Sequence, residues 1–266
     1  MIEVLKDYLK GRPEGQRASL TREYLQIACL KIIYDHRYFE NLAFVGGTCL
    51  RVLFDLKRFS EDLDFSLIEK KGYDFRAMND FIVRDFGLLG LTVESKPKTE
   101  NNVHGTILKF SGLMKPLGLS ELESQKLSIK FEIDTNPPKG GHLQDTVVNK
   151  VQLLNIRHFD LSSMFATKLH ACFYRKYVKG RDFYDFVWYM SKKVIPNFEL
   201  LNNAIEQTQK TNPAITRENF KQFLLGKIET IDFSLARKDV ERFLEDPGEL
   251  RLIDKPVLAG MIEQTY

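Results

Sequence analysis

The stretch FVGGTCLRVLFDLKRFSEDLDFSL, residues 44–67, decides how the rest of the sequence is interpreted. It begins with an apolar run that leads into Gly46-Gly47 and a helix-like segment, a pattern that predicts a strand, a tight turn and a helix. It ends in a second predicted strand that holds Asp62 and Asp64. Because side chains two residues apart leave a strand on the same face, the two carboxylates are expected to lie side by side.

Two features of this stretch have complementary chemistry. Carboxylates on one face of a strand suit Mg²⁺, which takes oxygen ligands and often bridges to substrate phosphates. A glycine pair at the start of a helix lets the backbone approach a phosphate, and the helix N-terminus supplies N–H donors. An ordinary turn or a polar strand face would show either feature alone. Together they predict a metal site beside a phosphate site.

A strand predicted at residues 126–134 carries a second pair of acids. Its apolar and polar residues alternate, so Glu132 and Asp134 share the polar face. A site with two metal ions needs a further carboxylate besides Asp62 and Asp64 to balance the charge. Alternation leaves open whether Glu132 or Asp134 is that third acid, and an exposed strand face would give the same pattern.

Charged residues recur at helical spacing in the C-terminal half. Lys168 and Arg175 are seven residues apart, and Asp182 and Asp185 are three apart, so each pair lies on one side of a helix. A lysine here could hold a triphosphate as a point charge. An aspartate could accept a proton from an attacking hydroxyl, or orient Arg175 or Arg181. Ion pairs on helix surfaces would give the same spacing.

The order of the predicted elements indicates an α+β fold in two parts. Helical periodicity changes to strand alternation in the middle of the chain, and helices return from Asp160 onward. Further elements of the first part are helices at residues 20–38 and 73–86 and strands at residues 91–96, 104–110, 126–134 and 147–156. We expect a mixed-sheet domain over residues 1–158 and a helical domain over residues 159–266.

Composition is that of a soluble globular protein. Of the 266 residues, 43% are hydrophobic and 28% charged, and no apolar run approaches the roughly 20 residues that cross a bilayer. The N-terminal residues mix charged and apolar side chains, unlike a signal peptide, so we expect a cytoplasmic protein without membrane contact. The net charge is +3, although residues 175–181 carry four cations and no anion. That segment could attract phosphate or be a solvated helix end.

Other catalytic classes find no support in the sequence. The three cysteines lack zinc-binding or redox spacing, and the five histidines are scattered without a ligand pattern. Neither a P-loop nor a GxSxG motif is present. P-loop NTPases and serine hydrolases are therefore disfavoured.

Taken together, the motifs resemble the nucleotidyltransferase signature of the AbiEii/AbiGii toxin family, within the DNA polymerase β-like nucleotidyltransferase superfamily. The resemblance rests on Gly46-Gly47-Thr48, on Arg58-x-Ser60-Glu61-Asp62-Leu63-Asp64-Phe65, on KFEIDTNPP at residues 130–138, and on Lys168, Arg175 and Arg181-Asp182-x-x-Asp185. These motifs follow one another in the family's order. The resemblance implies a polymerase β palm-like mixed sheet followed by a C-terminal helical domain.

The resemblance also implies roles for the site residues. Asp62 and Asp64 would hold Mg²⁺, or Mn²⁺ in its place, and Lys168 with Arg175 would contact the triphosphate of an NTP substrate. Asp182, or Asp185 instead, would be the catalytic base or an orienting acid.

The resemblance assigns phosphate binding to the glycine turn and a hydroxyl group. Gly46, Gly47 and Ser60 would line the phosphate pocket. The superfamily usually has Gly-Ser where this chain has Gly-Gly-Thr, so the hydroxyl that contacts phosphate could instead belong to Thr48.

The function implied is nucleotide transfer from an NTP to an acceptor, tRNA or another RNA, by the toxin of a toxin–antitoxin or abortive-infection system that acts in phage defence. An antitoxin protein would be its partner. Two alternatives remain open: transfer to a small molecule or a protein side chain, and a nucleotide-binding module without turnover.

Overall fold

The computed structural model describes all 266 residues, which form two compact units. The first comprises Met1–Asp55, Phe59–Asn136 and Asp145–His158. The second comprises Leu56–Arg58, Pro137–Gln144 and Phe159–Tyr266. None of the helices is both long enough and apolar enough to traverse a lipid bilayer.

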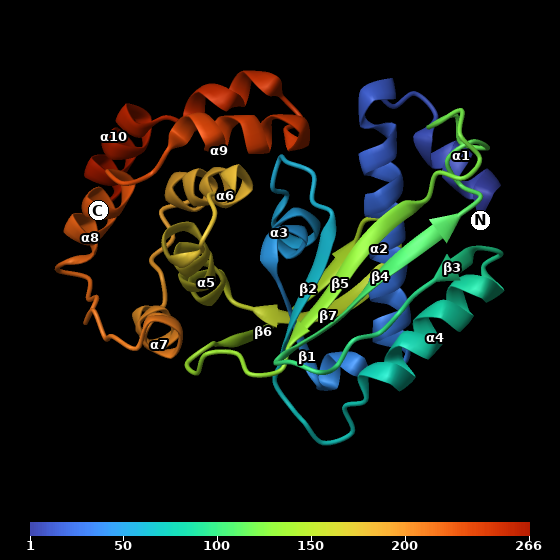
Figure 1. The fold of residues 1–266 in the computed structure, drawn as a ribbon, viewed down its shortest axis with the longest axis horizontal. Coiled ribbons are helices and arrows are strands. Elements are labelled where there is room, and N and C mark those ends of the chain that lie inside the picture. The colour runs from blue at the N-terminus through green and yellow to red at the C-terminus, as the bar shows by residue number, and fades with distance from the viewer. The chain divides into compact units, whose positions relative to one another are not determined.

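A mixed seven-stranded sheet organises the first unit (Figure 1). Its strand order is β3-β4-β5-β2-β1-β7-β6. The strands are β1 (Leu42–Val45), β2 (Asp62–Leu67), β3 (Thr92–Glu94), β4 (Val103–Ser111), β5 (Leu127–Asp134), β6 (Leu143–Asn149) and β7 (Leu153–Phe159). The first two residues of β6 and the last residue of β7 belong to the second unit. Strand β2 runs antiparallel to β1 and parallel to β5. The mixed sheet and the helices around it confirm the predicted α+β class.

Helices cover one face of this sheet. They are α2 (Arg17–Asp35), preceded by α1 (Ile2–Leu9), and α4 (Phe75–Leu88), and α2 and α4 pack on each other and on the strands (Figure 1). Under them, the rings of Phe65 and Phe131 lie 5.1 Å apart, and Phe75 of α4 packs on Phe131. Burial of each such ring stabilises the fold by roughly 1.5–3 kcal/mol. The opposite face presents the polar residues of β2 and β5, and helix α3 (Gly46–Phe54) contacts β2 on that side.

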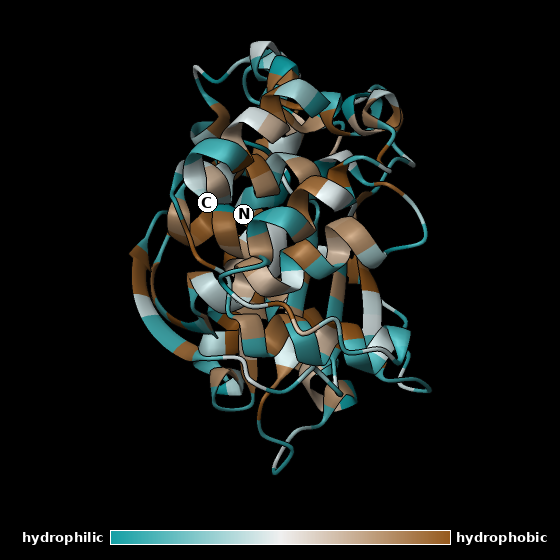
Figure 2. Cartoon of the chain, turned by 90° about the vertical axis from the view of Figure 1, so that its left-hand side faces the viewer, coloured by the Kyte–Doolittle hydropathy of each residue, from teal (hydrophilic) through white to brown (hydrophobic).

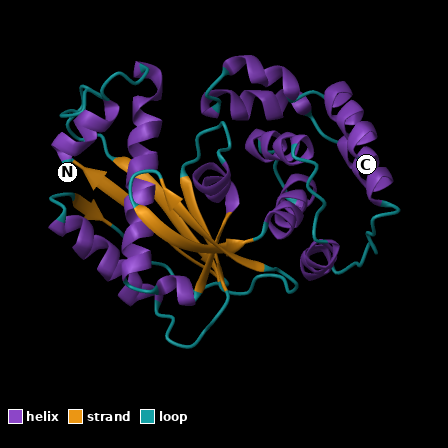
Figure 3. Ribbon diagram, turned by 180° about the vertical axis from the view of Figure 1, so that it is seen from behind, coloured by secondary structure: helices purple, strands orange, loops and turns teal.

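The second unit is helical (Figure 3). Its helices are α5 (Leu161–Tyr174), α6 (Gly180–Ser191), α7 (Phe198–Gln209), α8 (Phe220–Ile228), α9 (Phe233–Val240) and α10 (Lys255–Thr265). Hydrophobic and hydrophilic segments alternate along the helical ribbons of the chain (Figure 2), and the stacked rings of Phe165 and Tyr189 join α5 to α6. A Cβ on Gly180 would lie 1.8 Å from the carbonyl oxygen of Ala236, so only glycine lets α6 approach α9 this closely.

Local signals in the sequence explain several element boundaries. The Asp160 carboxylate accepts a hydrogen bond from the Ser163 backbone N–H and caps α5. The single strand predicted at residues 147–156 is wrong, because β6 ends at Asn149 and β7 begins at Leu153. Lys150, in the turn between them, donates its ammonium to the Arg51 carbonyl, a contact that alternation cannot reveal.

Candidate active site

Strand β2 presents Asp62 and Asp64 on one face of the sheet. The burial pattern alternates along the strand, with both aspartates half-buried and Leu63 and Phe65 buried on the other side. Parallel pairing with β5 places Asp62 beside Lys130 and Asp64 beside Glu132. Paired residues on neighbouring strands share a face, so three carboxylates and one ammonium lie in two adjacent rows.

The glycine turn lies directly against Asp64. Gly46 opens helix α3 (Gly46–Phe54) with φ of 79°, a conformation that residues with a Cβ rarely adopt. A Cβ there would lie only 2.7 Å from Oδ2 of Asp64. The first turn of α3 has backbone N–H groups that no residue of the same helix accepts. The turn therefore brings N–H donors to the carboxylate row.

Hydrogen bonds to the backbone fix the start of β2. The hydroxyl of Thr48 donates to the Asp62 carbonyl, and Nε2 of Gln26 donates to the Ser60 carbonyl at 3.2 Å. Thr48 is 1% exposed and Ser60 is 8% exposed. Thr48 thus ties α3 to the strand that carries the acids. Its nucleotide-binding role, like that of Ser60, stays a prediction.

The acids of β5 have different environments. The ammonium of Lys130 lies 2.6 Å from the Glu132 carboxylate, which it neutralises. Asp134 is paired in register with Ser66, one row farther along the sheet. Burial raises the pKa of Asp134, although its carboxylate accepts a hydrogen bond from the Asn136 backbone N–H. Glu132 is therefore already ion-paired, whereas burial disfavours the charged form of Asp134.

The donor set of the first unit fits a hard divalent cation held mainly by two residues. Nowhere in the chain do three or more histidine, cysteine, aspartate or glutamate side chains gather closely enough to hold one metal ion. The structure thus brings Asp62 and Asp64 to one face but does not assemble them with Glu132 and Asp134 into a four-acid cage. Mg²⁺ commonly binds through one or two carboxylates, with waters and substrate phosphates completing the shell, so this pair suits it.

The predicted residues of the second unit form a buried ion-pair cluster. The Lys168 ammonium lies 2.7 Å from Asp182 and 2.8 Å from Asp185. Arg175 reaches Asp182 at 2.6 Å. Arg58 binds Asp185 through Nε and Nη2, both at 2.7 Å. These five residues are called the Lys168 cluster below.

Burial and charge compete in this cluster. Burial by itself would lower the pKa of Lys168, but the carboxylates of Asp182 and Asp185 outweigh it and raise the pKa above its ordinary value. Burial would likewise raise the pKa of Asp182, yet Lys168 and Arg175 lower it. Asp182 is therefore a weak base. Of its two predicted roles, the surroundings favour orientation of Lys168 and Arg175 over proton abstraction.

Two contributors to these sites were missed from the sequence. Arg58 entered only as part of a motif, although it is 2% exposed and holds both oxygens of Asp185. Gln26 looked like one polar residue in a helix, although it is 1% exposed and binds the backbone ahead of β2. An arginine or glutamine inside an apolar pattern was the available signal, since such residues are seldom buried without a partner.

Comparison with known proteins identifies a family and a fold for the chain. The family model described as nucleotidyl transferase AbiEii toxin, type IV toxin–antitoxin system, matches residues 29–255. The structure of JHP933 from Helicobacter pylori is 18% identical, with a TM-score of 0.53 over 93% of this chain and 91% of that chain. That of a presumed nucleotidyltransferase from H. pylori is 19% identical, with a TM-score of 0.54 over 93% of this chain and 94% of that chain. No curated protein matches the chain.

Proposed function

Since the chain belongs to the AbiEii family of nucleotidyl transferase toxins of type IV toxin–antitoxin systems, we propose that it transfers a nucleotide from an NTP to an RNA acceptor, with Mg²⁺ held by Asp62 and Asp64. Family membership implies a nucleotide substrate and an antitoxin partner. Three parts of this statement are proposals: the metal, the acceptor, which is tRNA or another RNA, and a role in phage defence.

One observation carries the proposal. The Asp62–Asp64 pair shares a strand face, and the Gly46 turn is packed against Asp64 with no room for a side chain. A metal-bound triphosphate needs carboxylate oxygens to coordinate the metal and N–H groups to donate hydrogen bonds to its phosphates. Their contact within one unit of the fold supports a nucleotide site at this place.

The residues of this site would bind different parts of the substrate complex. Asp62 and Asp64 would hold Mg²⁺, which supplies positive charge to the oxygens that attack and leave the phosphorus. The N–H groups of Gly46 and Gly47 would hold phosphate oxygens. In the transfer, an acceptor hydroxyl oxygen forms a bond to the α-phosphorus, and the bond from that phosphorus to the β-phosphate bridge breaks with release of pyrophosphate.

Lys168 keeps its predicted role as a triphosphate ligand in this proposal. Its ammonium has three N–H groups, and Asp182 and Asp185 each accept from it. The two carboxylates hold the side chain in one orientation and keep it charged. Asp182 and Asp185 would thus act through Lys168, and the proton of the acceptor hydroxyl would leave to solvent.

The test uses purified protein, total RNA, Mg²⁺ and each NTP labelled at its α-phosphate in turn. We expect label in an RNA band with the wild-type protein and none with Asp62→Ala. The Asp7→Ala variant removes an exposed carboxylate of α1 from the same unit and should label RNA as the wild type does. Full labelling by Asp62→Ala would overturn the metal-binding assignment. Label in a protein band, or in a small molecule, would instead identify another acceptor.

A further inference from the structure

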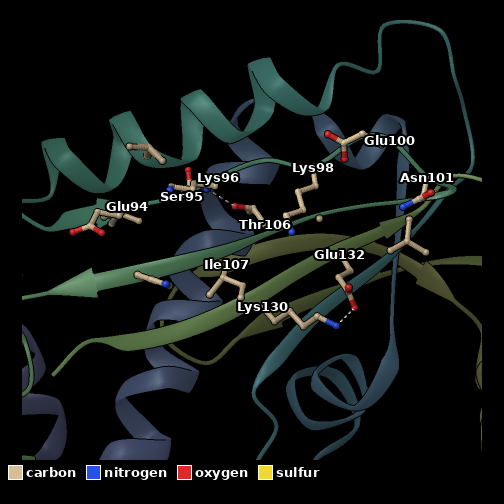
Figure 4. Close-up of a pocket in the computed structure, with 15 residues that line it drawn as sticks. Glu94, Ser95, Lys96, Lys98, Glu100, Asn101, Thr106, Ile107, Lys130 and Glu132 are labelled. Atoms are coloured by element: carbon tan, nitrogen blue, oxygen red, sulfur yellow. Dashed lines mark hydrogen bonds and ion pairs between the residues drawn. The ribbon is translucent and has the colours of Figure 1, made fainter.

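The open face of strands β3, β4 and β5 has a hollow of about 820 Å³ next to the acid rows. Four lysines line it, Lys96, Lys98, Lys109 and Lys130, together with the exposed side chain of Ile107 (Figure 4). Helix α2 covers the other face of these strands, and α4 borders the hollow beside β3, where Val83 is part of the lining. The hollow lies entirely within residues 83–132 of the first unit.

Strand register connects the hollow to the candidate active site. Lys98 is bridged to Gly105, which is paired with Glu132, which is paired with Asp64. These four positions form one row across the sheet, and neighbouring strands are about 4.8 Å apart. Gly105 has no side chain to fill the middle of the row. A Cβ there would lie 3.4 Å from Cγ of Glu132.

A second row runs parallel to the first. Ile107 is paired with Lys130, which is paired with Asp62. Glu94 is opposite Lys109 and Lys98 is opposite Gly105, so Lys96, midway between them, falls opposite Ile107. Both rows therefore lead from edge lysines to a predicted metal ligand.

The lysines differ in whether a carboxylate already neutralises them. Lys130 is paired with Glu132, and Glu94 of the rim is paired with Lys126 at 2.6 Å. Lys96, Lys98 and Lys109 make no ion pair within the chain. Glu100 is the one lining acid without a cationic partner. Glu94 also interacts with Lys109, but four lysines against three glutamates in the lining still give the hollow a net positive charge.

We propose that this lysine-lined sheet face binds the single-stranded end of the acceptor RNA, with its backbone phosphates on Lys96, Lys98 and Lys109 and its terminal hydroxyl at the Asp62–Asp64 end of the rows. Lys96 and Lys98 are two residues apart in the extended segment that follows β3, about 7 Å, which suits successive phosphates of one RNA strand rather than one triphosphate. The aliphatic surface of Ile107 lies between the cations, where a base can pack. This proposal rests on the proposed function for the transfer reaction at Asp62 and Asp64. The binding of RNA to the lysines does not depend on it.

RNA binding can be measured without catalysis. The probe is a 5′-fluorescein-labelled oligo(A) RNA, titrated with protein in the absence of NTP and Mg²⁺ over a series of KCl concentrations. Each phosphate contact to a single strand contributes about 0.7 to the slope of log K against log salt. The triple variant Lys96→Gln, Lys98→Gln, Lys109→Gln should lower that slope by about 2 and weaken binding about tenfold or more at low salt.

The matched control is Lys10→Gln, Lys70→Gln, Lys71→Gln. It removes three exposed lysines of the same unit and changes the net charge equally. It should keep both the slope and the affinity within about twofold of wild type. Circular dichroism of each variant reports whether the fold is kept.

Four results would overturn the proposal: no oligo(A) binding by the wild type, an unchanged slope in the lysine variant, an equal loss in the control, or loss of MgATP binding in place of RNA binding. Lysine-dependent RNA binding together with no transfer of label would support this proposal while the proposed function fails. Transfer of label by the wild type, together with RNA binding that does not depend on these lysines, would support the proposed function while this proposal fails.

Discussion

Gly46 lies directly against Asp64, although the two are eighteen positions apart in the chain. The Cα of Gly46 faces the Asp64 carboxylate so closely that a Cβ would overlap Oδ2, at 2.7 Å. The antiparallel register of β1 and β2 produces this contact, because Val45 is paired with Asp64. The residue after Val45 has to turn into helix α3 at that point, and glycine alone fits.

Substitution Gly46→Ala should therefore impair both stability and transfer. Strain at positive φ costs of order 1–2 kcal/mol, and the new Cβ displaces the Asp64 carboxylate besides. We expect nucleotide transfer to fall by at least tenfold, measured by incorporation of labelled NTP. The matched control is Gly72→Ala, since Gly72 has φ of 80° and nothing within 4 Å of its Cβ position. Gly72→Ala should lose stability but keep activity, and equal activity losses in both variants would contradict the steric argument.

Substitution Thr48→Val distinguishes two roles of a hydroxyl. Loss of the bond from Thr48 to the Asp62 carbonyl should reduce the free energy of unfolding by about 1–2 kcal/mol and lower kcat, with little change in the KM for NTP. Urea denaturation and steady-state kinetics measure the two effects. Thr48→Ser should restore both. A raised KM without loss of stability would show that Thr48 contacts the nucleotide instead.

Substitution Asp185→Asn should destabilise the second unit strongly. It leaves Arg58 and Lys168 buried with one carboxylate fewer, a loss of about 3–5 kcal/mol for a broken buried pair. Denaturation followed by Trp188 fluorescence reports on this unit, since it contains the chain's one tryptophan. Glu229→Gln, which breaks the exposed pair with Lys255, should cost under about 1 kcal/mol. Similar losses in the two variants would contradict the burial argument.

Substitution Arg58→Lys tests the same cluster by changing a cation instead of a carboxylate. Arg58 holds both oxygens of Asp185 with a planar fork, whereas a lysine offers a single ammonium. We expect a lower free energy of unfolding than in the wild type despite the conserved charge. Wild-type stability in Arg58→Lys would mean that charge alone, and not the paired geometry, maintains the cluster.

The Lys168 cluster should also set how stability depends on pH. The pKa of Asp182 is lowered in the folded state, so its contribution is present above the ordinary aspartate pKa, about 3.9, and is lost as pH falls through the lowered value. The pKa of Lys168 is raised, so its contribution is present below about 10.4 and is lost only as pH rises through the raised value. The urea midpoints of wild type and Asp182→Asn should differ at neutral pH and converge in acid. A difference that persists unchanged at the lowest pH would contradict the linkage.

Much of the fold was predictable because its signals are local. Alternation placed Ile129 and Phe131 in the core, and the Asp160 cap marked the start of α5. The motifs that resemble the family end near residue 190, whereas the family match extends to residue 255. The later helices follow ordinary apolar periodicity, which contains no family-specific motif.

The sequence by itself determined that Asp62 and Asp64 share a face, because a strand has a period of two residues whatever it is paired with. It also determined that Lys168 and Asp182 lie on helices, because apolar periodicity is a local property. Only the tertiary structure decided that Glu132 lies beside Asp64, that Gly46 contacts Asp64, and that Arg58 and Lys168 share the carboxylates of Asp182 and Asp185. Strand register and helix packing join residues far apart in the chain, and spacing along the chain does not encode such contacts.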